Sequence, residues 1–285
     1  MHGPELVQAT THSERFERDG FVVVKGLFTP DELAPLRAAA DDIVAGFDAD
    51  AHRSVFRTDD RDAGRDDYFL DSAEAVHCFL EADAVAADGG LNRDKTLAIN
   101  KIGHALHDHV PAFGAFCRDP RVGALLRELG QVDPEVRQTM YIFKQPGIGG
   151  EVRWHQDASY LNSDPGGVIG LWVALEDADR DNGCLWMQPG RHRDGLREIF
   201  ELDWPSRRGE LRTLDPRPWT DDENAVAIEV SAGSLVAFHD HMPHYSSPNR
   251  SPRSRHAFAV HTSSAGTPWS AANWLQRRTL PPFAV

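Results

Sequence analysis

Two short stretches of the chain carry the residue types that hold a divalent transition metal. One is His155-Gln156-Asp157, and the other is the run 239–244, which contains three histidines and one aspartate. Alternate residues of a strand point to the same face, so we expect His155 and Asp157 side by side with Gln156 turned away. Two imidazoles and one carboxylate on one side of a metal form the facial triad of non-haem Fe(II) oxygenases, whose opposite side stays open.

The second stretch offers three histidines for the remaining ligand position. His239 ends an expected strand and His241 lies in the turn after it, so both are expected to be structural or solvent-facing. His244 is therefore the preferred ligand. Histidines elsewhere are expected to serve packing, hydrogen bonds or the substrate pocket, and not a second metal; they include His104, His107, His109, His192 and His261.

Residues suited to an anion follow the second stretch. Ser246 lies two residues after His244, and Arg255 lies eleven residues after it. An arginine at the start of the next strand can bind a carboxylate through two hydrogen bonds, and a hydroxyl adds a donor. A dicarboxylate cosubstrate needs such donors at the end remote from the metal. Lys101 lies in an otherwise apolar stretch and also needs an anionic partner there.

The elements that must position these residues change character along the chain. The β-branched run 20–28 predicts a strand, and Thr29-Pro30-Asp31-Glu32 has the cap, proline and acids that begin a helix. A mobile surface loop is expected at 48–67, short strands at 76–80 and 96–102, and two helical pieces at 105–129, broken around Asp119-Pro120. From residue 138 onward, short apolar runs alternate with turn clusters, which indicates a β-sandwich or barrel.

Composition and charge narrow the function classes. The chain has 285 residues, of which 44 are acidic and 30 basic, and its formal net charge is −14. An acidic surface repels phosphate backbones and anionic lipid headgroups, so we expect no nucleic-acid or membrane partner. The three cysteines are widely spaced and no secretory leader is expected, so the cytoplasm is the expected location. No protein partner is evident from the sequence.

The motifs together resemble the phytanoyl-CoA dioxygenase family of Fe(II)/2-oxoglutarate oxygenases. The shared features are HxD, the distal histidine, the arginine eleven residues later, the opening FERDGFVVVKGLFTPDELAPLR and the central NGCLWMQPGRH. The segments INKIGHALH, QTMYIFKQPGIGGEVRWHQDASYL, GLWVALEDA and PWSAANWLQ resemble the phytanoyl-CoA dioxygenase domain-containing protein 1 subgroup. Arg191 departs from the serine usual in this family, in a segment that is expected to shape a turn.

The resemblance implies roles for individual residues. It implies His155, Asp157 and His244 as iron ligands and Arg255 with Ser246 at the distal carboxylate of 2-oxoglutarate. Three further residues match positions that line the cosubstrate pocket: Lys101, Met140 and Trp172. The implied fold is mainly β with flanking α-helices, a double-stranded β-helix of the jelly-roll, cupin-like type. We expect one domain over 1–285, in which a strand and helices at 16–130 pack on a core at 136–265.

The implied activity is that of a dioxygenase with Fe(II), 2-oxoglutarate and O₂. It would hydroxylate an unactivated C–H bond of a small or medium organic molecule and release succinate and CO₂. The aspartate ligand favours hydroxylation or another oxidation over halogenation, because related halogenases lose this carboxylate. Two alternatives are a non-enzymatic, cupin-like metal-binding or sensor barrel and a zinc hydrolase, although no HExxH motif is present.

Overall fold

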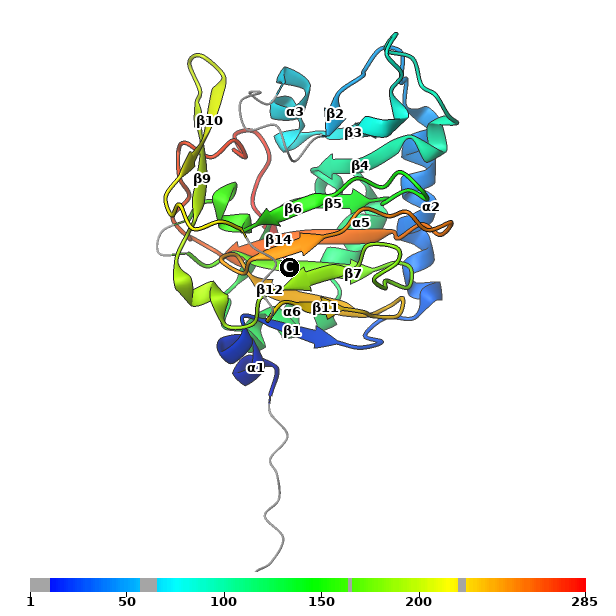
Figure 1. The fold of residues 1–285 in the computed structure, drawn as a ribbon. Helices are drawn as coiled ribbons and strands as arrows, with labels where there is room; N and C mark the ends of the chain where they lie inside the picture. The colour runs from blue at the N-terminus through cyan, green and yellow to red at the C-terminus, as the bar shows by residue number, and fades with distance from the viewer. Residues whose placement is uncertain (1–10, 57–65, 164–165, 220–223) are drawn as a thin grey trace, which may run out of the picture.

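The computed structural model describes residues 11–56, 66–163, 166–219 and 224–285 (Figure 1). The middle of the loop expected at 48–67, residues 57–65, lies outside these residues. Within its described part, Val55–Phe56 form strand β2, which pairs in parallel with β3 (Val76–Glu81). None of the helices in the described ranges is both long and apolar enough to cross a membrane.

The N-terminal region forms the strand and helix that the sequence predicts. Strand β1 (Phe21–Val24) follows helix α1 (His12–Asp19) and precedes helix α2 (Pro30–Gly46). The Thr29 hydroxyl accepts a hydrogen bond from the Glu32 amide, and the Glu32 carboxylate accepts one from the Thr29 amide. This capping box stabilises the start of α2 by about 1 kcal/mol. The helix is oriented by its buried apolar positions Leu33, Leu36, Ala40 and Val44.

A large sheet forms one wall of the molecule. Its strands lie in the order β1-β12-β7-β14-β5-β4-β3-β2, with β15 also paired to β5. All of its pairings except β2–β3 are antiparallel among the described residues. The strands not yet given bounds are β4 (Ile99–His104), β5 (Pro134–Ile142), β7 (Ile169–Ala174), β12 (Leu235–His239), β14 (Ala257–Ser264) and β15 (Phe283–Ala284).

A smaller sheet lies on one face of the large one. Its order is β11-β8-β13-β6. Its strands are β6 (Val152–His155), β8 (Leu185–Met187), β11 (Val226–Ile228) and β13 (His244–Ser246). A separate antiparallel hairpin, β9 (Glu198–Asp203) and β10 (Arg208–Thr213), projects beside the sheets in Figure 1.

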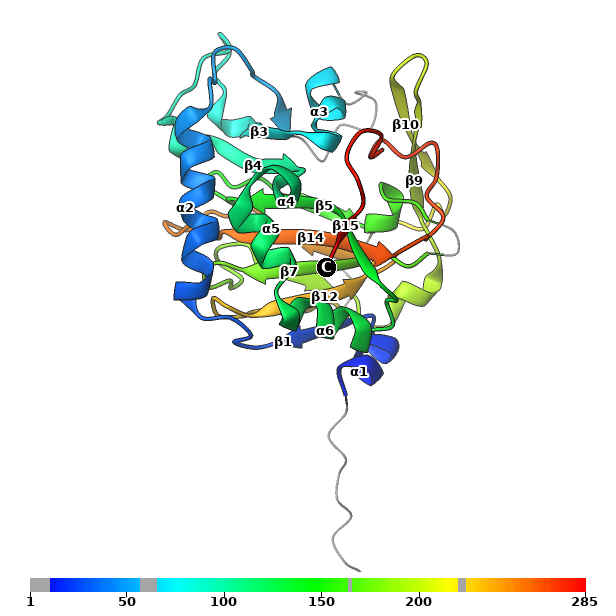
Figure 2. The same ribbon diagram turned by 180° about the vertical axis from the view of Figure 1, so that it is seen from behind.

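The core has two layers because the large sheet is buried on both faces. Trp172 and Phe238 on its inner face pack with Leu185 and Met187 of the small sheet. Its outer face packs against α2, α5 (Pro111–Cys117) and α6 (Pro120–Glu128), which Figure 2 shows running across it. Two facing antiparallel sheets with helices on one outer face form a double-stranded β-helix of the jelly-roll type, which confirms the predicted fold.

The sequence prediction is wrong at several element boundaries. The strand expected over 20–28 covers only Phe21–Val24. Region 105–129 contains three helices instead of two, because Pro111 lacks an amide hydrogen and begins a new helix after α4 (Leu106–His109). The strand expected from residue 96 begins at Ile99, because Asp94 caps a short 3-10 helix at Lys95–Leu97. The remaining short helices are α3 (Asp67–Asp71) and the 3-10 turns Ser72–Glu74, Ala82–Ala84, Asp157–Ser159 and Arg191–Asp194.

Candidate functional site

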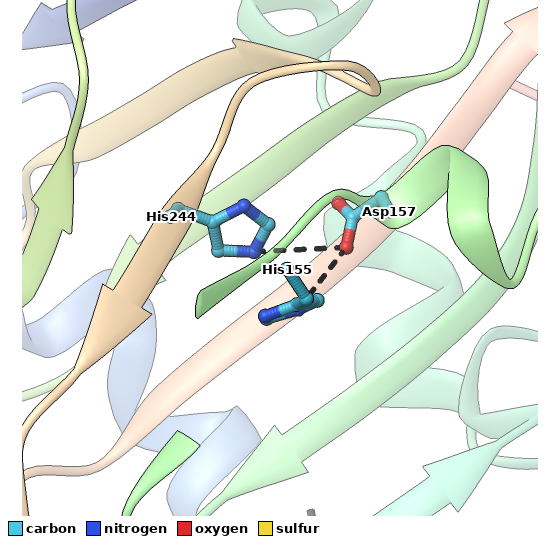
Figure 3. A group of neighbouring side chains, drawn as sticks. All are labelled: His155, Asp157 and His244. Atoms are coloured by element: carbon cyan, nitrogen blue, oxygen red, sulfur yellow. Dashed lines mark ion pairs between the residues drawn. The ribbon is translucent and has the colours of Figure 1, made fainter. Parts of the chain in front are cut away.

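Two histidines on adjoining strands and an aspartate just past one of them bring their ligand atoms together (Figure 3). His155 ends β6 and is the register partner of His244, the first residue of β13. The Asp157 Oδ1 atom lies 3.7 Å from Nε2 of His155 and 3.6 Å from Nε2 of His244. Their ligand atoms all lie within 4.8 Å of one another, and no other such group occurs among the described residues. Asp157 lies just past the strand, in a 3-10 turn, yet its carboxylate meets both imidazoles.

The backbone orients the two imidazoles of this group. Nδ1 of His155 lies 2.8 Å from the Arg153 carbonyl, and Nδ1 of His244 lies 2.9 Å from the Met242 carbonyl. A carbonyl only accepts hydrogen bonds, so both Nδ1 atoms carry the hydrogen and both Nε2 lone pairs face the aspartate. Burial, and next the neighbouring His244, lower the pKa of His155 to about 3, so this ligand is neutral at ordinary pH.

The carboxylate of Asp157 is ionised and has a separate partner for each oxygen. Oδ1 faces the two ligand histidines, and Oδ2 accepts a hydrogen bond from Nε2 of His261 at 2.9 Å. Burial alone would raise the pKa of this carboxyl group, but the neighbouring His261 and His244 outweigh it and hold the pKa well below its usual value. A carboxylate oxygen beside two imidazole nitrogens is a donor set that suits a divalent cation.

The competing histidines have other partners. Nδ1 of His239, the last residue of β12, accepts a hydrogen bond from the backbone amide of His241 in the turn that follows. His104 contacts the Ser72 hydroxyl, and His107 contacts the Thr139 hydroxyl. His109 donates to a backbone carbonyl. These histidines are therefore placed by structural contacts, as the sequence pattern indicated for His239 and His241.

A buried arginine lies where the sequence suggests an anion site. Arg255 is 1% exposed, and its guanidinium lies 5.1 Å from the Trp172 ring. Its Nε donates to the Gly183 carbonyl at 3.1 Å, and its Nη2 donates to the Ser246 hydroxyl at 3.4 Å. Its Nη1 is buried with no hydrogen-bond partner in the structure. Burial lowers the pKa of Arg255 to about 10, so the group stays charged at neutral pH.

The other predicted cosubstrate residues follow the inner face of the large sheet. Met140 and Trp172 are both register partners of Ala259, one on each side of β14. The Lys101 amine lies 3.8 Å from Met140 Sδ and 5.5 Å from the ring centres of Phe69 and Phe79. Lys101 is 5% exposed, so its charge is held in a largely apolar wall.

Two supporting residues, Lys144 and His261, have partners that sequence reasoning did not identify. Lys144 donates to the carbonyls of Gly150, which leads into β6, and Ser246 on β13, at 2.6 and 3.4 Å. It thus links the two strands that carry the ligand histidines. His261 was expected to pack, to form hydrogen bonds or to line the pocket, and the structure shows that its hydrogen-bond partner is Asp157. The alternation Ala257-Phe258-Ala259-Val260-His261 was the available signal, because it places residue 261 on the inner face with Ala259.

The jelly-roll fold and the two-histidine, one-carboxylate group together define the class of non-haem iron oxygenases. Comparison with known proteins then gives the family. The family model for phytanoyl-CoA dioxygenase (PhyH) matches residues 16–257. The chain belongs to the phytanoyl-CoA dioxygenase family.

Named relatives cover nearly the whole chain. It is 42% identical over 269 residues to a phytanoyl-CoA dioxygenase of Arabidopsis thaliana, covering 93% of each chain. It is 41% identical over 278 residues to phytanoyl-CoA dioxygenase domain-containing protein 1 of Rattus norvegicus, covering 95% of each chain. These identities confirm the subgroup that the motifs resemble.

Solved structures share the fold at lower identity. EctD from S. alaskensis, solved with 2-oxoglutarate and 5-hydroxyectoine, superposes with a TM-score of 0.63 at 21% identity, covering 98% of this chain and 88% of that one. The epimerase SnoN, solved with Fe³⁺, alpha ketoglutarate and nogalamycin RO, superposes with a TM-score of 0.61 at 17% identity, covering 94% and 89%. Both comparisons confirm the cupin-like architecture.

Proposed function

We propose that the protein is an Fe(II)- and 2-oxoglutarate-dependent dioxygenase that hydroxylates an unactivated C–H bond of a small or medium organic metabolite. The observation that carries this proposal is the pairing of two sites in one barrel. One is the group formed by His155, Asp157 and His244, and the other is the buried Arg255 with its unpartnered Nη1. A buried cationic donor without an acceptor is costly, and the distal carboxylate of a dicarboxylate would satisfy it.

The residues present fit both Fe(II) and 2-oxoglutarate. The two Nε2 lone pairs and Oδ1 of Asp157 would hold Fe(II), and Arg255 with Ser246 would hold the distal carboxylate of 2-oxoglutarate. Trp172, Met140 and Lys101 would wall the cosubstrate pocket. When bound, iron and 2-oxoglutarate supply the oxidising chemistry that uses O₂, releases succinate and CO₂, and oxidises the substrate.

The protein's own contribution is binding, orientation and exclusion of water. The carbonyls of Arg153 and Met242 hold the two imidazole rings in one tautomer. The packed core between the sheets, which includes Trp172 and Met187, keeps the cosubstrate end of the barrel dry. A low local dielectric strengthens the attraction between Arg255 and a carboxylate.

The substrate and the outcome are the finer parts of the proposal. Asp157 supports oxidation without halogenation, because the ligand set has its carboxylate. The net charge of −14 supports a substrate smaller and less anionic than an acyl-CoA.

Two further parts of the proposal concern the chain as a whole. The contacts of the N-terminal helices with the sheet core support one domain over 1–285. The three buried free thiols support a cytoplasmic location.

The decisive experiment is anaerobic titration of the iron-loaded protein with 2-oxoglutarate. A weak visible metal-to-ligand charge-transfer band is expected, because a cosubstrate chelating Fe(II) produces one. Bound iron without this band would overturn the proposal. Succinate release, screened across a library of small metabolites in the presence of O₂, then identifies compounds that increase turnover above the uncoupled rate.

A further inference from the structure

We propose that His261, held by Gln138, is a positioning residue that aims Oδ1 of Asp157 at the metal. This inference rests on the proposed iron site and assigns a role to residues that do not themselves bind the metal. The starting observation is that the two oxygens of Asp157 have different partners. Oδ1 faces His155 and His244, whereas Oδ2 is bound by Nε2 of His261 at 2.9 Å.

Hydrogen-bond donors and acceptors fix the state of the His261 ring. An ionised carboxylate only accepts hydrogen bonds, so Nε2 of His261 must carry the hydrogen that Asp157 receives. The other ring nitrogen, Nδ1, lies 3.1 Å from the Gln138 amide nitrogen, which donates to it. Gln138 therefore selects the tautomer of His261 that can donate to Asp157. His261 and Gln138 are 3% and 5% exposed, so water does not replace either contact.

The three strands that meet here place the supporting residues in one row. His261 on β14 is the register partner of Gln138 on β5 and of Gly170 on β7. A Cβ atom at Gly170 would lie 3.1 Å from Oδ2 of Asp157 and 2.7 Å from the Phe238 ring. The glycine therefore leaves the space that the carboxylate occupies. One side of Oδ2 meets a donor, and the other side meets a residue without a side chain.

Asp157 needs this support because of its place in the chain. It lies beyond the end of β6, in a 3-10 turn, so strand pairing does not hold it. Rotation about the terminal bond of an aspartate is broad, and either oxygen can turn toward a cation. The bond from His261 occupies Oδ2 and leaves Oδ1 for the metal. Such outer partners of metal ligands commonly contribute 10- to 100-fold, as an order of magnitude, to metal affinity.

The test compares Fe(II) affinity in matched variants, measured anaerobically by titration calorimetry without cosubstrate or turnover. His261→Phe keeps a ring but removes the donor, and we expect about a 10- to 100-fold weaker Fe(II) affinity. His261→Gln supplies an amide donor and is expected to recover most of the loss. His256→Gln is the control, because residue 256 lies next to the same strand but contacts the Tyr141 hydroxyl instead.

A second measurement separates positioning from general stability. Co(II) replaces Fe(II) as a probe, and its visible absorption reports the ligand set. We expect a changed Co(II) spectrum in His261→Phe, a nearly native one in His261→Gln, and similar thermal unfolding of the two metal-free variants. Should His261→Phe fail to fold, Gln138→Leu keeps the histidine and removes its tautomer support, with about a 3- to 10-fold loss expected.

The outcomes distinguish this inference from the proposed function. A wild-type protein that binds no Fe(II) would overturn the iron site itself. Wild-type binding with unchanged affinity and spectrum in His261→Phe, or in Gln138→Leu where that variant replaces it, would overturn only the positioning role. Equal loss in His261→Phe and His261→Gln would also contradict it, because the role requires a donor at that place.

Discussion

His155 and His244 are register partners on the antiparallel strands β6 and β13, with ring centroids 4.1 Å apart. The candidate metal site is therefore built across one strand pair of the small sheet. Strand β13 continues from His244 to Ser246, whose hydroxyl contacts Arg255. Alternation along β13 thus places a proposed iron ligand and a proposed cosubstrate contact on one face, two residues apart.

Removing His244 should weaken iron binding strongly, whereas removing His241 should not. His244→Ala deletes a ligand atom from the group, and we expect Fe(II) affinity to fall on the order of 100-fold or more. His241→Ala is the matched control, because that residue lies three positions earlier and outside the group. Anaerobic titration with Fe(II) measures both. A stronger effect of His241→Ala would reassign the third ligand.

Arg255 should determine the affinity for 2-oxoglutarate and leave iron affinity nearly unchanged. Arg255→Met removes a buried charged donor, at a cost of about 2–5 kcal/mol, or roughly 30- to 5,000-fold in affinity. Arg253→Met is the control, because Arg253 is half-exposed and pairs with Asp179 at the surface. The measurement is the 2-oxoglutarate concentration that half-saturates the anaerobic charge-transfer band. Equal 2-oxoglutarate affinities in the two variants would mean that the distal carboxylate does not bind Arg255.

The sequence predicted the fold class and the metal-ligand geometry because both depend on local patterns. Short strands separated by turn residues indicated a β-sandwich or barrel, and HxD with a distal histidine indicated the two-histidine, one-carboxylate group. Strand alternation alone does not explain why Asp157 lies beside His155, because Asp157 lies in a turn just past the strand. The resemblance to a family supplied the roles of Met140 and Trp172, which have no chemical signature of their own.

The supporting contacts were not predictable because they depend on register between distant strands. Nothing in the sequence near His261 says that it faces Gln138 and Gly170, which lie 123 and 91 positions away; the pairing of β14 with β5 and β7 decides this. Lys144 is similar: its amine reaches the carbonyls of Gly150 and Ser246 only after the sheets close. Some element boundaries also depended on a single residue: Pro111, for example, begins helix α5.

Gly183 should tolerate no side chain, because it lies between Lys144 and Ser247. A Cβ there would lie 2.6 Å from the Ser247 carbonyl oxygen and 2.7 Å from Cε of Lys144, at φ +85°. Gly183→Ala should therefore lower the free energy of unfolding by about 2–4 kcal/mol and weaken 2-oxoglutarate binding, since the Gly183 carbonyl orients Arg255. The measurements are urea unfolding and cosubstrate titration.

Gly147→Ala is the control for this change. Gly147 has a similar φ of +73°, but a Cβ there would meet nothing within 4 Å. It should cost only the backbone strain of about 1–2 kcal/mol and leave cosubstrate affinity unchanged. Identical effects of the two substitutions would show that crowding at Gly183 is unimportant.

The metal-free protein should lose stability as the pH falls from about 6.5 toward 4. Burial lowers the pKa of His155 and that of His107 to about 3 each, below their ordinary value of 6.5. Between these values the unfolded chain binds more protons than the folded one, so acid favours unfolding by up to about 1.4 kcal/mol per pH unit for each histidine. The lowered pKa of Asp157 acts in the same sense, because its stabilisation is lost as the pH falls below about 3.8.

Urea unfolding at several pH values between about 4.5 and 7.5, roughly the range in which histidines titrate, measures this slope. His107→Gln removes one of these titrating histidines, at a site whose side chain is fully buried and remote in sequence from the proposed metal ligands. Its slope should therefore be smaller than that of the wild type by about 1.4 kcal/mol per pH unit, whatever its absolute stability. An unchanged slope would mean that His107 is protonated in the folded protein, with its charge balanced by Asp108 at 3.0 Å.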